Sequence, residues 1–196
     1  INANGNVKID NKDEGYIIYA DDAKYFKNKE LFLTKGQSKA INEGIIIDAD
    51  NFEYDKIKNI INANGNVKIK DTINDYLILA NESIYYKNSE KIITKGKTEA
   101  DIQSKYFITS KNITYLHDKK TISSQHKTKI KDQKSKVYFA EKFNYLINQE
   151  IVKGENFLII TNYNLPKSDK FFLNSAIINL NDNKFIAKDT KIEVHK

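Results

Sequence analysis

A nine-residue segment occurs twice in this chain of 196 residues. Residues 1–9 and residues 61–69 both read INANGNVKI, and the match continues at the same offset of 60 residues, for example at Tyr16 and Tyr76. Self-similarity at a fixed period is typical of proteins that stack one supersecondary unit on the next. The chain is therefore expected to fold as a stack of similar elements.

Half of that period describes the chain better still. A small residue is followed five positions later by Tyr or Leu six times, with spacings of 29, 31, 30, 30 and 35 residues between successive occurrences. The pairs are Ala20/Tyr25, Ala49/Tyr54, Ala80/Tyr85, Ser110/Tyr115, Ala140/Tyr145 and Ser175/Leu180. Each repeat is thus predicted to be one element of about 30 residues.

Within a repeat the apolar residues alternate with a period of two, which is typical of β-strands. Ile78 and Ala80 alternate with Leu77 and Leu79, and the inward register resumes at Ser83 after one extra residue, which indicates a bulge. Short turns rich in Asn, Asp and Lys follow, and they favour antiparallel hairpins. They are expected at 27–30, 55–58, 87–90, 117–120, 148–150 and 181–183. The sequence predicts an all-β fold of about a dozen or more antiparallel strands.

One connection is longer than the others. Residues 162–169 contain Pro166, the only proline, and are expected to form a surface loop or a seam. Residues 1–196 are otherwise expected to form a single domain. The start at Ile1, with neither an initiator Met nor a signal-peptide pattern, predicts a fragment of a longer protein.

The composition excludes several classes of function. All 32 basic residues are Lys, and the chain has no Arg, Cys, Met or Trp. A net charge of +6 would suggest nucleic acid as a partner. Proteins that recognise specific bases usually use bidentate Arg side chains, which this chain lacks, so no nucleic-acid partner is expected. Without Cys there is neither a disulfide framework nor thiol chemistry. No stretch approaches the roughly 20 apolar residues that span a bilayer.

No catalytic or metal-binding constellation is visible in the sequence. His117, His126 and His195 have no carboxylate or Cys partner at ligand spacing, and the glycines are too scattered for a phosphate loop. Asp48 and Asp50 could be interpreted as the paired carboxylates of a glycoside hydrolase. This interpretation is not favoured, because Asp50 is the Asp of the repeated motif. The protein is therefore expected to be no enzyme and to use no cofactor and no metal.

The densest basic run lies between Lys127 and Lys136. On a strand, three of its lysines would share one face. They could meet phosphate groups of a lipid, or they could form a solvated edge that blocks sheet aggregation.

The repeated motifs resemble those of the OstA-like family of lipopolysaccharide transport. Units of that family carry a G-N-V strand, as at 5–7 and 65–67, and an A-D-x-x-x-Y strand. The second motif matches directly at Ala20-Asp21 and Ala49-Asp50, nearly at Ala80-Asn81, and by pattern only at Ser110, Ala140 and Ser175. The resemblance extends over essentially the whole chain.

This resemblance implies a V-shaped β-jellyroll whose open groove holds the acyl chains of lipopolysaccharide. It also implies a location in the periplasm of a Gram-negative bacterium, in association with the outer membrane, and end-to-end joining with other OstA-like jellyrolls. The family includes a soluble bridge protein and the N-terminal domain of an outer-membrane assembly protein that carries a β-barrel in the same chain. The length of this chain favours the second.

The lining of the groove is predicted from the repeats. It comprises the apolar residue two positions before each small residue, together with the Tyr series: Ile18, Ile47, Ile78, Ile108, Tyr138, Leu173, Tyr25, Tyr54, Tyr85, Tyr115 and Tyr145. The same residues could instead form an ordinary core. A register change of one residue would make the opposite face the lining, with Tyr19, Leu79, Phe107 and Phe139.

The first and last strands are predicted to expose unpaired backbone groups that a partner could extend by strand addition. Val7 and Ile9 mark the first edge, and Ile192 and Val194 mark the last. The expected function is transport of lipopolysaccharide by shielding its acyl chains. The alternative is a β-solenoid domain of a surface adhesin or a polysaccharide-processing protein, with parallel turns and a closed core.

Overall fold

The computed structural model describes residues 1–11 and 15–195, and its regular elements there are eighteen β-strands and three short 3₁₀ turns. All strand pairs with a defined register in these residues are antiparallel, so the prediction of an antiparallel all-β fold is confirmed. The chain divides into two compact units, Ile1–Ala100 and Asp101–Lys196.

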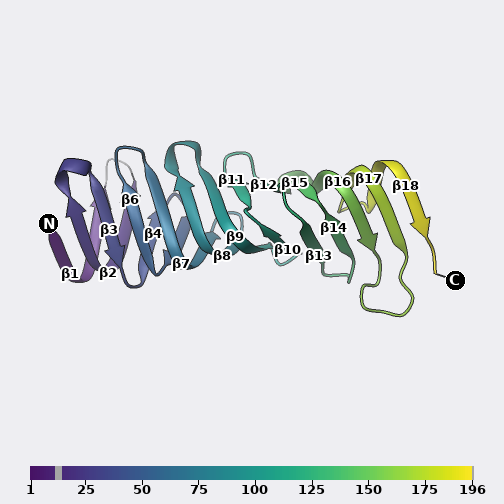
Figure 1. Cartoon of the computed structure of the whole chain (residues 1–196), viewed down its shortest axis with the longest axis horizontal. Helices are drawn as coiled ribbons and strands as arrows, with labels where there is room; N and C mark the ends of the chain where they lie inside the picture. The colour runs from purple at the N-terminus through teal and green to yellow at the C-terminus, as the bar shows by residue number, and fades with distance from the viewer. Residues whose placement is uncertain (12–14, 196) are drawn as a thin grey trace. The chain divides into compact units, whose positions relative to one another are not determined.

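The first unit contains eight strands and two 3₁₀ turns, and a ninth strand carries the chain into the second unit (Figure 1). The elements are β1 (Asn2–Asn11), β2 (Tyr16–Phe26), η1 (Lys27–Lys29), β3 (Leu31–Lys35), β4 (Ser38–Asn42), β5 (Ile45–Ala49), β6 (Asn51–Asp55), β7 (Ile60–Asp71), β8 (Tyr76–Tyr86), η2 (Lys87–Ser89) and β9 (Lys91–Ile102).

The second unit continues with shorter strands and closes on three long ones. Its elements are β10 (Tyr106–Lys111), β11 (Thr114–Leu116), β12 (Thr121–Ser124), β13 (Thr128–Asp132), β14 (Val137–Ala140), β15 (Lys142–Leu146), η3 (Ile147–Gln149), β16 (Ile151–Ile160), β17 (Lys170–Asn179) and β18 (Lys184–Glu193).

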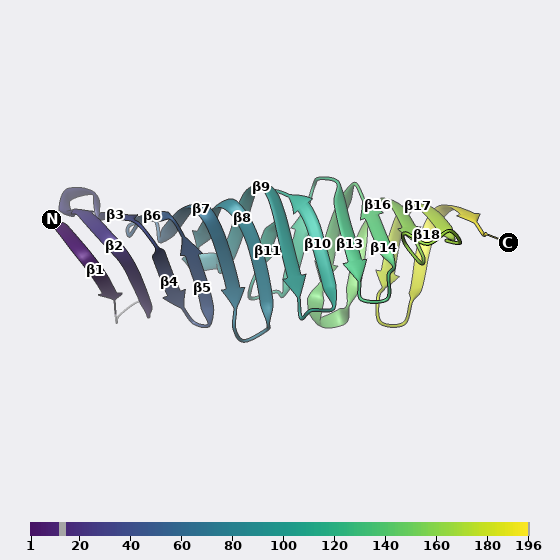
Figure 2. The same ribbon diagram turned by 90° about the horizontal axis from the view of Figure 1, so that it is seen from below.

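Long strands change their partners halfway along their length. β7 pairs through 60–64 with β6 and through 68–71 with β5. β2 likewise pairs through 22–26 with β3 and through 16–19 with β4. Each long strand therefore crosses between two layers of sheet, and the sheet folds back over an enclosed interior. Figure 2 shows β4, β5, β7 and β8 side by side in one of these layers.

We call the two layers the first layer and the second layer. In the first unit the first layer holds 7–11, 16–20, β4, β5, 67–71 and 76–80, and the second layer holds 2–4, 22–26, β3, β6, 60–64 and 82–86. In the second unit the first layer holds β10, β13, β14, 157–160, 170–173 and 190–193, and the second layer holds β11, β12, β15, 151–155, 175–179 and 184–188.

The repeated motifs meet where the chain crosses between the layers. The register of β7 and β8 shifts between Asn64 and Val67, and Gly65 and Asn66 adopt φ values of 77° and 50°. Both oxygens of the Asp50 carboxylate accept hydrogen bonds from Asn66 Nδ2, at 3.2 and 3.1 Å. The Asp50 amide donates to the Gly65 carbonyl at 2.9 Å. In this repeat the A-D and G-N pairs therefore interact at the crossover, where Gly and Asn tolerate positive φ.

Later repeats keep this arrangement with other residues. Asn156 Nδ2 donates to the Glu141 carboxylate at 2.6 Å, and the Glu141 amide donates to the Glu155 carbonyl. Asn174 Nδ2 donates to Asp189 at 3.2 Å. A carboxylate paired with an Asn side chain thus serves the crossover even where the sequence matches only by pattern.

The expected turns are confirmed, since each predicted segment lies at a 3₁₀ or hydrogen-bonded turn between strands. Residues 162–169 form an irregular connection between β16 and β17, as expected for a surface loop. This loop lies inside the second unit, whereas the chain divides between Ala100 and Asp101.

Candidate functional site

The predicted lining residues face the enclosed interior. In the first unit, direct cross-strand pairs join one apolar row across the first layer: Ile9, Ile18, Ala40, Ile47, Ile69 and Ile78. In the second unit the corresponding row is Ile108, Ile130, Tyr138, Ile159 and Phe171. Leu173 lies on the adjacent row, opposite Phe157. The repeats thus build a continuous apolar ladder within each unit.

This ladder is packed rather than open. Ile18 is 0% exposed, Ile47, Ile78 and Ile108 are 1% exposed, and Tyr138 and Leu173 are 3% and 2% exposed. The open V-shaped groove is therefore not confirmed, because side chains from the two layers fill the space between them.

The Tyr series fills the interior from the second layer. Tyr54, Tyr85, Tyr115 and Tyr145 are buried, while Tyr25 is half-buried and stacks on Phe32 with ring centroids 4.2 Å apart. These rings are among the largest side chains of the interior, so they fill much of the space between the layers.

Some tyrosines connect the two layers directly. Tyr16 of the first layer meets Tyr54 edge to face at 4.9 Å. Tyr85 Oη donates to Asn42 Oδ1 at 3.1 Å, and Tyr106 Oη donates to Glu150 Oε2 at 3.3 Å. The layers are therefore held together by hydrogen bonds as well as by apolar contact.

Burial raises the pKa of four interior tyrosines, Tyr76 and the three considered next. Burial, reinforced by Glu90 and Glu43, raises the pKa of Tyr85 to about 12. Burial also raises the pKa of Tyr106 and of Tyr138, with the carboxylates of Glu150 and Asp132 as the next causes in the two cases. All three phenols are thus neutral hydrogen-bonding groups at neutral pH.

The opposite face of the strands points outward. Tyr19, Leu79 and Phe107 are 39%, 41% and 44% exposed, and Phe139 is half-buried. The predicted register is therefore the one in which Ile18 and Ile78 face inward.

The two outermost strands pair on one side. β1 pairs with β2, and β18 pairs with β17, and neither pairs with another strand of its own unit in the described residues. Val7 and Ile9 are half-buried, and Ile192 is 52% exposed. Val194 lies just beyond the end of β18. Three of the four predicted edge residues thus lie on the outermost strands β1 and β18, and the prediction that Val194 belongs to the last strand is wrong.

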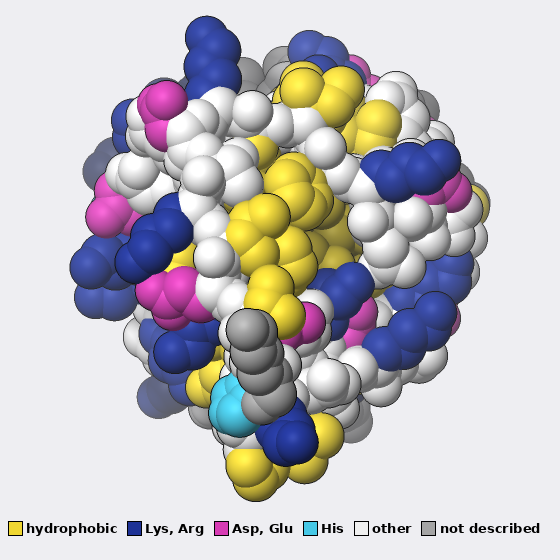
Figure 3. All heavy atoms as spheres, turned by 90° about the vertical axis from the view of Figure 1, so that its right-hand side faces the viewer, with side chains coloured by type: hydrophobic (Ala, Val, Ile, Leu, Met, Phe, Trp, Pro, Cys, Tyr) yellow, Lys and Arg dark blue, Asp and Glu magenta, His cyan; other side chains and the backbone are white. Residues whose placement is uncertain are grey.

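The interior opens at the β18 end of the second unit. Phe171 and Phe185 meet there edge to face at 5.9 Å, and they border a hollow of about 90 Å³ together with Tyr138 and Ile159. Figure 3 shows hydrophobic side chains gathered in the middle of this end, within a rim of polar and charged residues. An apolar surface continuous with the core is therefore accessible at this end.

The other candidate residues have structural partners. Asp48 pairs with Lys39 at 3.4 Å, and Asp50 belongs to the crossover described above. His126 Nε2 lies 3.0 Å from Asn112 Nδ2. The His195 amide donates to Asp169.

The ring of His117 contacts Tyr115. Within the described residues no group of His, Asp and Glu side chains is arranged to hold a metal ion.

The lysine run lies on the outer surface of the first layer. Lys129 Nζ lies 4.7 Å from the ring centroid of Tyr163 and 5.8 Å from that of Phe139. Lys131 is exposed on the same strand, and Lys136 donates to Asn183. Lys129 and Lys131 are the lysines of the run that lie on β13, so two side chains, not the expected three, share one strand face. Lys129 makes the cation–π contacts.

Comparisons with known proteins leave the family open. No family model matches the sequence, and no curated protein matches it. Among the described residues no helix is long and apolar enough to cross a membrane. The resemblance to the OstA-like family therefore stays a prediction.

Sequence reasoning missed two features. One is the hollow beside Phe171, which depends on the way the last strands end. The other is a trough on the outer surface of the second layer. The one available signal was the irregular last repeat, with a spacing of 35 and Leu180 in place of Tyr.

Proposed function

We propose that this protein is a lipopolysaccharide-transport domain of the OstA-like type, located in the periplasm. It shields acyl chains between the two layers and passes them toward the outer membrane. The role is non-catalytic and requires no cofactor. The observation that carries the proposal is the accessible apolar end of the interior around Phe171 and Phe185 (Figure 3).

The physical argument starts from burial. An acyl chain gains about 0.8 kcal/mol for each methylene removed from water. The packed ladder must separate to admit such a chain, so acyl groups replace contacts that the two layers otherwise make with each other. Because successive rungs present similar Ile and Tyr side chains, a bound chain meets similar surroundings at each step and can move along the ladder.

The edge strands supply the proposed partners. A second OstA-like jellyroll would pair with β1 or β18 and extend the sheet, which would continue the apolar interior from one chain to the next. Ile192 and the half-buried Ile9 would then be covered. The alternative of a parallel solenoid is not favoured, since the pairings are antiparallel.

A photo-crosslinking experiment tests the lipid path. Benzoylphenylalanine replaces Phe171, which borders the hollow, or Phe172, which faces Lys191 on the outer surface. A second matched pair is Ile78, which is buried, and Leu79, which points outward. The four proteins are irradiated with purified lipopolysaccharide.

Crosslinking at Phe171 and Ile78, with little at Phe172 and Leu79, is the expected result. Competition by the lipid A portion, but not by the delipidated saccharide, would identify the acyl chains as the bound group. Equal labelling of inward and outward positions, or no labelling at any of the four, would refute the proposal.

A further inference from the structure

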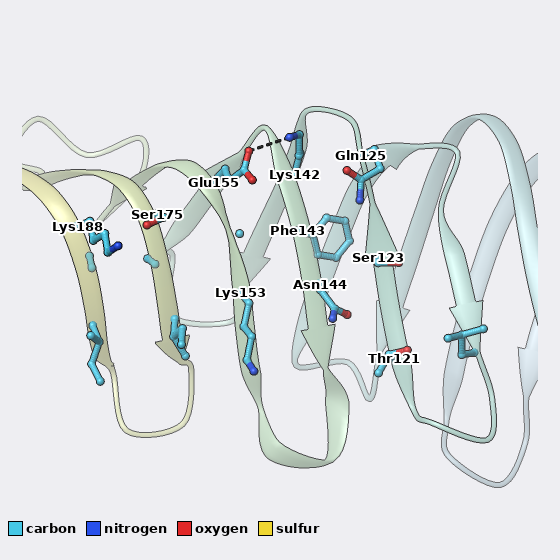
Figure 4. A pocket seen from close by; sticks show the side chains of 16 residues that line it. Thr121, Ser123, Gln125, Lys142, Phe143, Asn144, Lys153, Glu155, Ser175 and Lys188 are labelled. Carbon is cyan, nitrogen blue, oxygen red and sulfur yellow. Dashed lines mark ion pairs between the residues drawn. The ribbon is translucent and has the colours of Figure 1, made fainter.

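The outer surface of the second layer is hollowed in the second unit. A trough of about 710 Å³ runs across β12, β15, β16, β17 and β18, on the side of these strands that faces away from the interior (Figure 4). It is distinct from the apolar space between the layers.

Cross-strand pairing builds the trough from two parallel rows. One row joins Ser123, Asn144, Lys153, Ile177 and Ile186 as successive direct partners. The other row, two residues away along the strands, joins Lys142, Glu155, Ser175 and Lys188. Because these residues stand opposite one another in register, their side chains project from one face.

The charge in the trough is positive. Lys142 pairs with Glu155 at 2.9 Å, drawn as the dashed line in Figure 4, which neutralises one lysine. Lys153 and Lys188 have no ion-pair partner among the described residues. Three lysines and one glutamate thus leave two uncompensated positive charges. Lys153 and Lys188 lie on strands two places apart and in rows two residues apart, so their Cα atoms are about 12 Å from each other.

The uncharged polar groups of the trough are also available. Thr121, Ser123, Asn144 and Ser175 line it, and these side chains make no hydrogen bond within the described part of the chain. Hydroxyl and amide groups both donate and accept, so they complement the hydroxyl groups of sugars. Ile177 and Ile186, which are 45% and 79% exposed, provide apolar surface at one end.

The first unit lacks this combination. The corresponding row there consists of Lys24, Leu33, Glu53, Asn62 and Ile84. That row has no hydroxyl group, and the Glu53 carboxylate balances the charge of Lys24 within it, so the trough is not a by-product of the repeat.

We infer that this trough binds an acidic glycan. Sugar hydroxyl groups would bond Ser123, Asn144 and Ser175, and anionic substituents of the glycan would meet Lys153 and Lys188. Single-stranded nucleic acid is a poorer fit, because such sites need exposed aromatic rings for base stacking, and the one aromatic residue of the trough, Phe143, is 2% exposed. The inference does not rest on the proposed lipid function, since the trough and the lipid path lie on opposite sides of the second layer.

Titration calorimetry with the full chain tests the inference. The probes are oligogalacturonate, which carries carboxylates, a phosphorylated mannan oligosaccharide, a neutral glucan oligosaccharide and inorganic phosphate. The variant is Lys153→Gln/Lys188→Gln. The matched control is Lys70→Gln/Lys131→Gln, which removes two exposed strand lysines with no ion pair among the described residues and changes the net charge equally.

At least one acidic oligosaccharide should bind the unaltered chain, and the trough variant should bind it about 2- to 30-fold more weakly, which corresponds to the loss of two exposed charge contacts. The control should bind nearly as the unaltered chain does. Replacing Ser175 by Trp fills the trough without a change in charge and should also weaken binding.

Three results would overturn the inference. Equal weakening in the trough variant and the control would indicate general charge attraction. Binding of inorganic phosphate as strong as that of the oligosaccharides would indicate a simple anion site, and the absence of binding by both acidic probes would rule out the glycan. Lipopolysaccharide crosslinking at Phe171 should be unchanged in the trough variant, so the failure of one proposal is distinguishable from that of the other.

Discussion

Replacing Gly65 by Ala tests the physical reason for the repeated motif. Gly65 has a φ of 77°, and a Cβ placed there would overlap the Asp50 carboxylate. Gly96 has nearly the same φ, 76°, but a Cβ there meets no atom within 4 Å. The pair therefore separates the cost of the backbone conformation from the cost of displacing the carboxylate.

The magnitudes follow from these two costs. An L-residue in the left-handed region costs roughly 1–2 kcal/mol, which applies to both variants. At Gly65 the carboxylate must also leave its two hydrogen bonds with Asn66, which adds about 1 kcal/mol because the group is exposed. Gly65→Ala should thus lower the unfolding free energy by about 2–3 kcal/mol, and Gly96→Ala by about 1–2 kcal/mol.

Urea denaturation followed by far-ultraviolet circular dichroism measures both changes. A double-mutant cycle with Asp50→Ala adds a sharper test. Once the carboxylate is removed, the Cβ of residue 50 remains 3.0 Å from the added methyl group, so Gly65→Ala should cost only slightly more than Gly96→Ala. If Gly65→Ala and Gly96→Ala destabilise equally, or if the effects of Asp50→Ala and Gly65→Ala are additive, the crossover interaction does not account for the motif.

Three further predictions concern the interior. Thr34→Val should lower the unfolding free energy by about 1–3 kcal/mol in urea titrations, because Thr34 Oγ1 accepts a hydrogen bond from the buried Phe52 amide at 2.7 Å. A loss smaller than that of an exposed Thr→Val change would contradict this prediction. Ile78→Ala should cost about 2–5 kcal/mol and Leu79→Ala much less, since only Ile78 is buried; similar losses would mean that the register is wrong. Because the pKa of Tyr85 is raised from about 10 to about 12 in the folded state, its contribution to stability is present below about pH 10 and is lost as the pH rises toward 12. Tyr85→Phe should therefore flatten the fall in the urea midpoint over that pH range, and an unchanged fall would assign it to other groups.

Local patterns were sufficient for the strands, and they favoured one face without excluding the other. Ile18 and Ile78 were preferred as inward residues because a strand alternates its side chains with a period of two, but a register change of one residue left the opposite face open. The turns at 27–30 and 87–90 followed from their polar composition and their position between apolar segments. The same reasoning favoured a structural role for Asp50 over a catalytic one, since a residue that recurs with the motif belongs to the scaffold.

The candidate sites were less predictable, because they depend on partners far apart in the chain. Tyr85 bonds Asn42, 43 residues away, and the fold that brings them together also fills the space that was expected to be an open groove. The outer trough was invisible for the same reason: Asn144, Lys153 and Ile177 become neighbours only through the pairing of three strands.

The sequence by itself determined that the chain is a stack of antiparallel strands whose side chains alternate between two faces, because periodicity is a local property of the backbone. Only the tertiary structure decided that the layers close on each other, that the motif residues interact at the crossover, and that Lys153 and Lys188 share a trough. These outcomes depend on which strands pair and in which register. Packing over the whole interior selects the strand pairing and the register, because large side chains such as Tyr54 and Tyr85 fill the interior in one arrangement and would leave cavities in others.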